Sequence, residues 1–223
     1  MVGWGDKDAF VLRVHPFLRA RWIDPTFLTL AGVALSLASG TAFYLDRPVW
    51  AGAILIGAGW CDMVDGVVAR HQGRASLRGA FLDSTLDRLS DLLLFGGIAL
   101  GATRRAETGL ALLALWAATV AVLTSYSRAR AELHLSRLDV GWMDRGWRCL
   151  ILIAGGLTGR VEIALLAIGL GGTWTAGRRV WTGWRQLESL ERTGRDPTLG
   201  PDPRSPREGP EKADSEPGAP RNR

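Results

Sequence analysis

The chain has 223 residues, of which 47% are hydrophobic, and its formal net charge is +5. This length accommodates one domain and a tail. Its basic residues lie beside apolar segments, so membrane orientation and phosphate binding explain the charge better than nucleic acid does, and we predict no nucleic-acid partner. Two cysteines and three scattered histidines offer neither a disulfide framework nor a zinc site.

The chain divides into three regions by composition. Residues 1–24 mix apolar and basic positions, and we interpret 9–23 as an amphipathic helix in the membrane interface, with a soluble amphipathic helix as the alternative. Residues 25–190 hold the long apolar stretches. Residues 191–223 are rich in proline, glycine and charge, which predicts a disordered cytoplasmic tail.

The apolar stretches predict an all-α integral membrane protein with six transmembrane helices. They begin near Phe27, Val49, Gly79, Gly109, Trp147 and Ile163, and the fifth stretch is short. If the N-terminus is cytoplasmic, most arginines fall in inner loops, and the outer loops keep only Arg47, Arg104, Arg105 and Arg160. By the positive-inside rule, this distribution predicts a multi-pass protein of the cell membrane with both termini in the cytoplasm.

The second and third predicted spans are joined by the most distinctive stretch, which reads DMVDGVVARHQGRASLRGAFLDSTLD from residue 62 to residue 87. Asp62 and Asp65 are three positions apart and Asp83 and Asp87 four apart, so each pair shares one face of a helix. Carboxylates are costly at membrane depth and usually mark a functional site. Their oxygens suit Mg²⁺ or Mn²⁺, which commonly bridge carboxylates and substrate phosphates. The pattern predicts a metal and phosphate site on the cytoplasmic side.

The fixed positions of this stretch resemble, without gap or substitution, the signature of the CDP-alcohol phosphatidyltransferase family: Asp62-x2-Asp65-Gly66-x2-Ala69-Arg70-x8-Gly79-x3-Asp83-x3-Asp87. The layout of six spans, with this motif across the second and third, is also similar to that family. The resemblance implies a metal-dependent transfer of phosphatidyl from a CDP-linked lipid, such as CDP-diacylglycerol, to a polar alcohol. CMP would be released.

The resemblance also implies roles for individual residues. Two ions, Mg²⁺ or Mn²⁺, would be held by the four aspartates Asp62, Asp65, Asp83 and Asp87. Asp87 would also be the general base that takes the proton of the acceptor hydroxyl. Contacts with the CDP-lipid are implied for Thr26, Phe27, Leu28, Thr29, Gly66, Ala69, Arg70, Ser76 and Gly79. Thr26 stands where Asp or Asn is more usual in the family.

Within the family, the segments SYSRARAE and DVGWMDRGWR look most like phosphatidylinositol phosphate synthases and their archaeal-lipid counterparts. That likeness implies inositol 1-phosphate as acceptor, with its phosphate bound by Arg128, Arg148 and Arg179. Arginine suits a phosphate dianion because its planar fork binds two oxygens. Arg128 replaces a typical Lys and Gly146 a typical Pro, so glycerol 3-phosphate is the alternative acceptor. A homodimer is expected, since dimers are common among similar proteins.

An ion-coupled membrane transporter is the alternative from a different class, because intramembrane carboxylates also serve proton and cation pathways. Against it, the acidic residues cluster at one end of the spans, and no inverted repeat is evident. Asp91, one turn past Asp87, is either a further site residue or the cap of a polar patch.

Overall fold

The computed structural model describes residues 11, 13, 15, 24–194 and 196–199. Within 24–199 the chain forms six helices, which confirms the predicted all-α architecture. The predicted interfacial helix at 9–23 lies mostly outside the described residues. The predicted tail at 191–223 lies outside them from residue 200 onward. The helices are α2 (Pro25–Tyr44), α3 (Pro48–His71), α4 (Leu77–Arg104), α5 (Thr108–Ala131), α6 (Arg145–Leu157) and α7 (Val161–Thr193).

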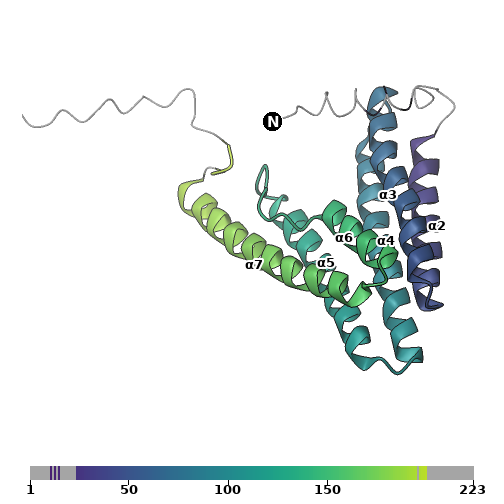
Figure 1. Ribbon diagram of the computed structural model, residues 1–223. Coiled ribbons are helices and arrows are strands. Elements are labelled where there is room, and N and C mark those ends of the chain that lie inside the picture. Colours follow the sequence, from purple (N-terminus) through teal and green to yellow (C-terminus); the bar gives the residue numbers. More distant parts are fainter. Residues whose placement is uncertain (1–10, 12, 14, 16–23, 195, 200–223) are drawn as a thin grey trace, which may run out of the picture.

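The helices form a bundle in which successive elements run up and down (Figure 1). α2 packs against α3 and α4, whereas α5 packs against α4 and α7. The short α6 contacts α3 and α7, and so connects the two halves of the bundle. α7 continues past the predicted boundary at 190 to Thr193, where Gly194, with φ 65°, ends it in the left-handed conformation.

Three polar residues fix the helix starts at one end of the bundle. Asp24, Ser76 and Asp144 cap α2, α4 and α6, and each side chain accepts a backbone N–H from the first turn that follows. α3, α5 and α7 end where these helices begin (Figure 1). This end, called the capped end below, therefore gathers polar side chains from all six helices.

Close crossings between helices depend on glycine. A methyl group on Gly97 of α4 would lie 2.1 Å from the carbonyl oxygen of Gly40 on α2. A methyl group on Gly156 of α6 would lie 3.0 Å from the backbone of Gly52 on α3. Small residues at such points let membrane helices approach each other closely.

Three helices, α2, α3 and α5, are long and apolar enough to cross a membrane by length and composition. The predicted count of six helices is thus confirmed, while this criterion supports three of the six predicted spans. With 13 residues, α6 is about 20 Å long, which is less than the ~30 Å hydrocarbon core. α4 carries Asp83 and Asp87 in its first half and Asp91 just past its midpoint, and α7 has a polar last third.

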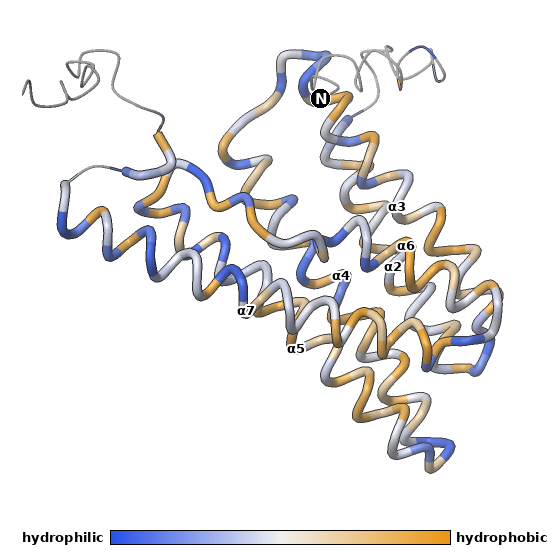
Figure 2. The backbone as a smooth tube through the Cα atoms, turned by 60° about the vertical axis from the view of Figure 1, so that its left-hand side comes forward, coloured by the Kyte–Doolittle hydropathy of each residue, from blue (hydrophilic) through white to orange (hydrophobic). Residues whose placement is uncertain are grey.

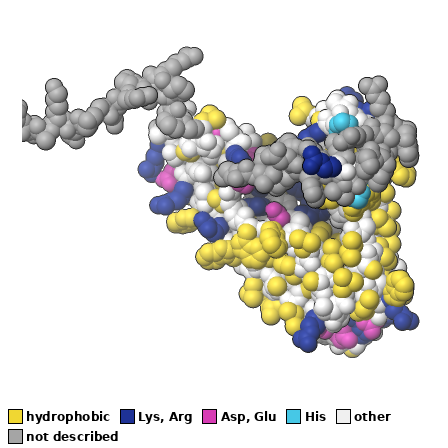
Figure 3. Space-filling model, turned by 45° about the horizontal axis from the view of Figure 1, so that its top comes forward, with side chains coloured by type: hydrophobic (Ala, Val, Ile, Leu, Met, Phe, Trp, Pro, Cys, Tyr) yellow, Lys and Arg dark blue, Asp and Glu magenta, His cyan; other side chains and the backbone are white. Residues whose placement is uncertain are grey.

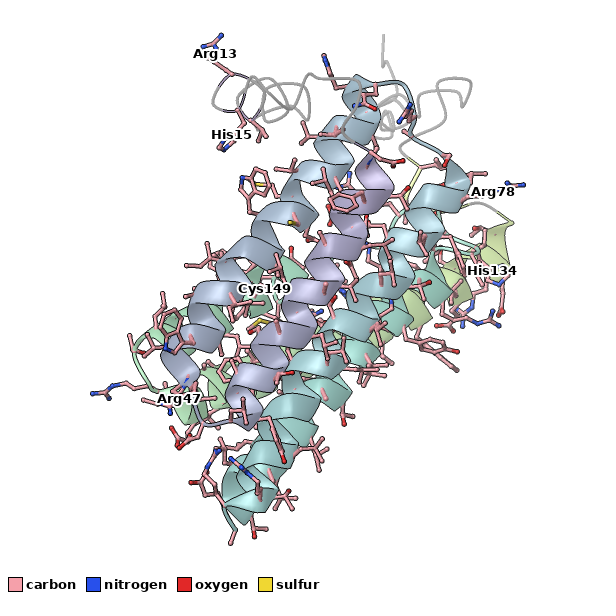
Figure 4. The ribbon with its side chains drawn as sticks, turned by 90° about the vertical axis from the view of Figure 1, so that its right-hand side faces the viewer. Arg13, His15, Arg47, Arg78, His134 and Cys149 are labelled. Atoms are coloured by element: carbon pink, nitrogen blue, oxygen red, sulfur yellow. The ribbon has the colours of Figure 1, made fainter. Side chains whose placement is uncertain are left out.

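The surface has the distribution that membrane helices require. Apolar residues dominate the middle of the helices, and polar residues gather at their ends and connections (Figure 2). A broad hydrophobic surface lies between charged side chains at the two ends (Figure 3). Arg47 and Arg78, predicted to lie on opposite sides of the membrane, are at opposite ends of the bundle (Figure 4).

Candidate active site

The four aspartates of the motif lie at the capped end, because α3 ends there and α4 begins there. Asp62, Asp83 and Asp87 each offer a carboxylate oxygen, and these three oxygens lie within 4.8 Å of one another. Asp65 lies apart from that trio and accepts a hydrogen bond of 2.7 Å from the Thr29 hydroxyl on α2. Asp62, Asp65 and Asp87 nevertheless line one narrow gap. The structure brings all four predicted aspartates to one place.

The arrangement of these carboxylates fits a divalent cation. The Oδ1 atom of Asp83 is buried and accepts no hydrogen bond from the described residues. A buried carboxylate oxygen without a donor is costly, and a bound cation would offset that cost. Carboxylate oxygens are also the ligands that Mg²⁺ and Mn²⁺ prefer.

One cavity of about 270 Å³ opens between the capped ends of α2, α3 and α4, and we call it the α2–α4 cavity. Asp65 and Asp83 line it, together with seven of the nine predicted CDP-lipid contacts: Thr26, Thr29, Gly66, Ala69, Arg70, Ser76 and Gly79. Phe27 and Leu28 do not line this cavity. The helical period explains the difference, since positions 26 and 29 share a face and the two between them point elsewhere. Leu28 is instead buried against Val64, Val67 and Val68.

Two glycines shape the wall of the α2–α4 cavity. A Cβ atom at Gly66 would lie 3.1 Å from Nη1 of Arg70, so this glycine leaves room for the guanidinium to fold back along α3. Gly79 donates its backbone N–H to the Ser76 hydroxyl at 3.1 Å, and a Cβ there would lie 3.2 Å from that oxygen. The glycines of the motif thus place an arginine and a hydroxyl at the cavity.

A second cavity, of about 210 Å³, lies on the other side of α4, and we call it the α4–α6 cavity. It is lined by Asp83, Ser84, Asp87, Arg88, Asp91, Ser125, Arg145 and Arg148. Asp83 lines both cavities. Asp91 lines this cavity, which favours the interpretation as a site residue over the cap of a polar patch.

The three predicted acceptor arginines have different surroundings. Arg148 lines the α4–α6 cavity, is 3% exposed, and pairs with Asp91 through an Nη2–Oδ2 distance of 2.6 Å. Arg179 is buried behind it and donates to the backbone carbonyls of Val140 and Thr124, at 2.9 and 2.8 Å. Arg128 pairs with Glu132 at 2.9 Å. Of the three, only Arg148 lines the α4–α6 cavity.

Sequence reasoning missed Arg145, which the structure places among the aspartates. Its guanidinium donates to both Asp62 and Asp87, and its Nε lies 3.9 Å from Asp91 Oδ1. In the sequence Arg145 looks like one more basic residue of an inner loop. The signal that could have found it is Asp144 directly before it, because an Asp before an apolar run marks a helix start and so puts Arg145 in the first turn.

Residues 22–175 match the family model of the CDP-alcohol phosphatidyltransferases. The chain belongs to this family. It is 36% identical over 178 residues to the archaetidylinositol phosphate synthase of Pyrococcus horikoshii, a match that covers 79% of this chain and 92% of that protein. It is 37% identical over 147 residues to the phosphatidylinositol phosphate synthase of Streptomyces avermitilis, covering 64% and 60% of the two chains.

The fold is similar to solved structures of the phosphatidylinositol phosphate synthase of Mycobacterium tuberculosis. The crystal structure with CDP-DAG bound has a TM-score of 0.67 at 25% identity, and the match covers 79% of this chain and 91% of that chain. The structure with manganese and citrate gives the same TM-score and identity, over 79% and 87% of the chains. The protein is thus a membrane transferase with several apolar helices, and the transporter alternative is wrong.

Proposed function

We propose that the protein transfers the phosphatidyl group of CDP-diacylglycerol to a hydroxyl of inositol 1-phosphate and releases CMP. The observation that carries this proposal is Asp83, which lines both cavities, with Asp87 one turn further along α4 in the second. A transferase must bring two substrates to one reacting phosphorus. The α2–α4 cavity would hold the cytidine diphosphate, and the α4–α6 cavity would hold the acceptor.

On the nucleotide side, the chain's own groups position the diphosphate. Arg70 lines the α2–α4 cavity together with Gly79 and Ala80 from the first turn of α4, and positive charge beside a helix N-terminus favours phosphate. Thr29 fixes the Asp65 carboxylate by its hydrogen bond. Divalent cations held by Asp62, Asp65, Asp83 and Asp87, two ions in our proposal, would offset the charge on the diphosphate.

On the acceptor side, Asp87 is the proposed general base. It would take the proton of the acceptor hydroxyl, whose oxygen then bonds to the lipid-proximal phosphorus. The bond from that phosphorus to the bridging oxygen breaks, and the oxygen leaves with CMP. Arg148 would hold the acceptor's own phosphate with its planar fork. The likeness to synthases named for inositol phosphate products supports this acceptor.

The charge distribution supports an orientation for this chemistry. The capped end carries the arginines of the connections after α3 and α5 and of the last turns of α7, whereas Arg47, Arg104, Arg105 and Arg160 lie at the other end. By the positive-inside rule, the site faces the cytoplasm, where soluble CMP and inositol phosphate are found. Six membrane crossings, the cell membrane and a homodimer remain predictions.

An acceptor panel tests the proposal. Purified protein in detergent, with CDP-diacylglycerol and Mg²⁺ or Mn²⁺, is given inositol 1-phosphate, inositol, glycerol 3-phosphate or glycerol, and CMP is measured. We expect CMP release with inositol 1-phosphate, none with the two acceptors that lack phosphate, and none after addition of EDTA. CMP release with glycerol 3-phosphate but not with inositol 1-phosphate would show that glycerol 3-phosphate is the acceptor. A panel in which no acceptor releases CMP would reject the transfer reaction.

A further inference from the structure

Arg145 lies where the family motif assigns no residue. From the first turn of α6 its guanidinium donates to Asp62 on α3 and to Asp87 on α4, so one positive charge is shared between carboxylates of two other helices. The Arg145 side chain is 18% exposed, so bulk water screens these contacts only weakly. Arg145 therefore acts as a counter-charge for two of the proposed metal ligands.

A divalent cation would compete with this guanidinium. The carboxylate oxygens that accept from Arg145 belong to two of the three residues that meet within 4.8 Å. A cation bound to Asp62 and Asp87 would repel the adjacent guanidinium, because like charges at such distances cost free energy. Arg145 then needs another carboxylate.

Asp91 is that carboxylate. Its Oδ1 lies 3.9 Å from Nε of Arg145, which is buried and donates no hydrogen bond to the described residues. A shift of about 1 Å would bring the two atoms to the usual distance of a charge-assisted hydrogen bond. The second oxygen of Asp91 pairs with Arg148 at 2.6 Å. The two arginines on one face of α6 thus share one acidic partner on α4.

We propose that Arg145 exchanges between the metal ligands and Asp91: it holds Asp62 and Asp87 together until a divalent cation takes them, and then it pairs with Asp91. This inference rests on the proposed role of Asp62 and Asp87 as metal ligands. The exchange has a consequence for the second cavity. When Arg145 forms an ion pair with Asp91, that carboxylate neutralises the charge of Arg148 less, and Arg148 binds an acceptor phosphate more tightly.

The test measures Mn²⁺ binding by electron paramagnetic resonance on the purified full chain, with CDP present, and needs no turnover. Four proteins form a double-mutant cycle: wild type, Arg145→Gln, Asp91→Asn and the double variant. Arg145→Gln removes the competing charge, and we expect it to bind Mn²⁺ about tenfold more tightly than wild type. Asp91→Asn removes the second partner of Arg145, so Mn²⁺ should bind more weakly in it, but not in the Arg145→Gln background. Arg137→Gln, which breaks an exposed pair with Asp139 at the same end of the bundle, is the matched control and should bind as wild type does.

The outcomes separate the two proposals. If wild type binds Mn²⁺ and Arg145→Gln binds it equally or more weakly, the exchange is rejected and the metal role of the aspartates stands. If neither wild type nor any variant binds Mn²⁺ with CDP, the metal role fails and the exchange with it. Melting curves identify a variant that does not fold. For that case Arg145→Met, which keeps a long side chain and removes the charge, replaces Arg145→Gln, and it should bind Mn²⁺ more tightly than wild type; equal or weaker binding rejects the exchange.

Discussion

The two cavities on either side of α4 are built in different ways. The α2–α4 cavity is lined by the start of α2 and by the stretch from Asp65 to Asp83, and short connections join the helices involved. The α4–α6 cavity takes its lining from α4, α5 and α6, and the long connection between α5 and α6 lies among these elements. The first is therefore set by local spacing on adjacent helices, and the second by tertiary packing.

The charged residues that line the two cavities differ as well. In the α4–α6 cavity, Arg145 and Arg148 are both paired with carboxylates of other helices. An acceptor phosphate would have to compete with Asp91 for Arg148. Phosphate binding on the acceptor side therefore depends on rearrangement of these ion pairs. The α2–α4 cavity is lined by Arg70 and Arg74 and by Gly79 and Ala80 at the N-terminal turn of α4.

Asp87→Asn should have the largest effect, because Asp87 is the proposed base. An amide cannot accept the proton, so we expect CMP release to fall about 10³-fold. Asp139→Asn, at an exposed aspartate outside both cavities, is the control and should keep wild-type turnover. Melting curves must show that both variants fold. A folded Asp87→Asn protein with more than a tenth of wild-type turnover would remove Asp87 from this role.

Arg148→Lys tests the acceptor side alone. Lysine keeps the charge opposite Asp91 but loses the fork that binds two phosphate oxygens. We expect the KM for the acceptor to rise about 30-fold, as for the loss of a strong charge-assisted hydrogen bond, with little change in CDP affinity. Arg128→Lys, on α5 and outside the cavity, should raise that KM less. Equal effects of the two substitutions would contradict the assignment of Arg148.

Thr29→Val tests the nucleotide side with a smaller change. It removes the 2.7 Å hydrogen bond to Asp65 and keeps the shape of the side chain. We expect Mn²⁺-dependent CDP affinity, followed by calorimetry, to weaken about tenfold. Thr41→Val, on the same helix, removes a hydroxyl that donates to the Leu37 carbonyl one turn earlier, and it should have no effect on CDP affinity. A shift in acceptor KM without a change in CDP affinity would show that the two cavities are not separate in function.

The nucleotide side could largely be predicted from the sequence. Helical spacing put Asp62 with Asp65 and Asp83 with Asp87, and the structure adds the hydrogen bond from Thr29, 36 positions before Asp65. The prediction included Phe27 and Leu28 because the resemblance covers all four residues from 26 to 29. In a helix, these two side chains point away from the cavity that Thr26 and Thr29 line.

The acceptor side could be predicted only in part. Arg148 was found by resemblance, but its pairing with Asp91 depends on how α6 packs between the other helices, which no local pattern encodes. The same packing brings Arg145 to Asp62, 83 positions earlier in the chain. With 13 and 33 residues, α6 and α7 are also much shorter and much longer than a typical membrane span. The length of a helix in the folded chain depends on packing and capping as well as on apolarity.

The most direct test of the proposed reaction follows the oxygen of the acceptor hydroxyl. Inositol 1-phosphate carrying ¹⁸O at its reacting hydroxyl is incubated with CDP-diacylglycerol, a divalent cation and the protein, and both products are analysed by mass spectrometry. Attack of that hydroxyl on the lipid-proximal phosphorus places all of the label in the lipid and none in CMP. Label in CMP, or CMP formed without a labelled lipid, would contradict the proposed transfer.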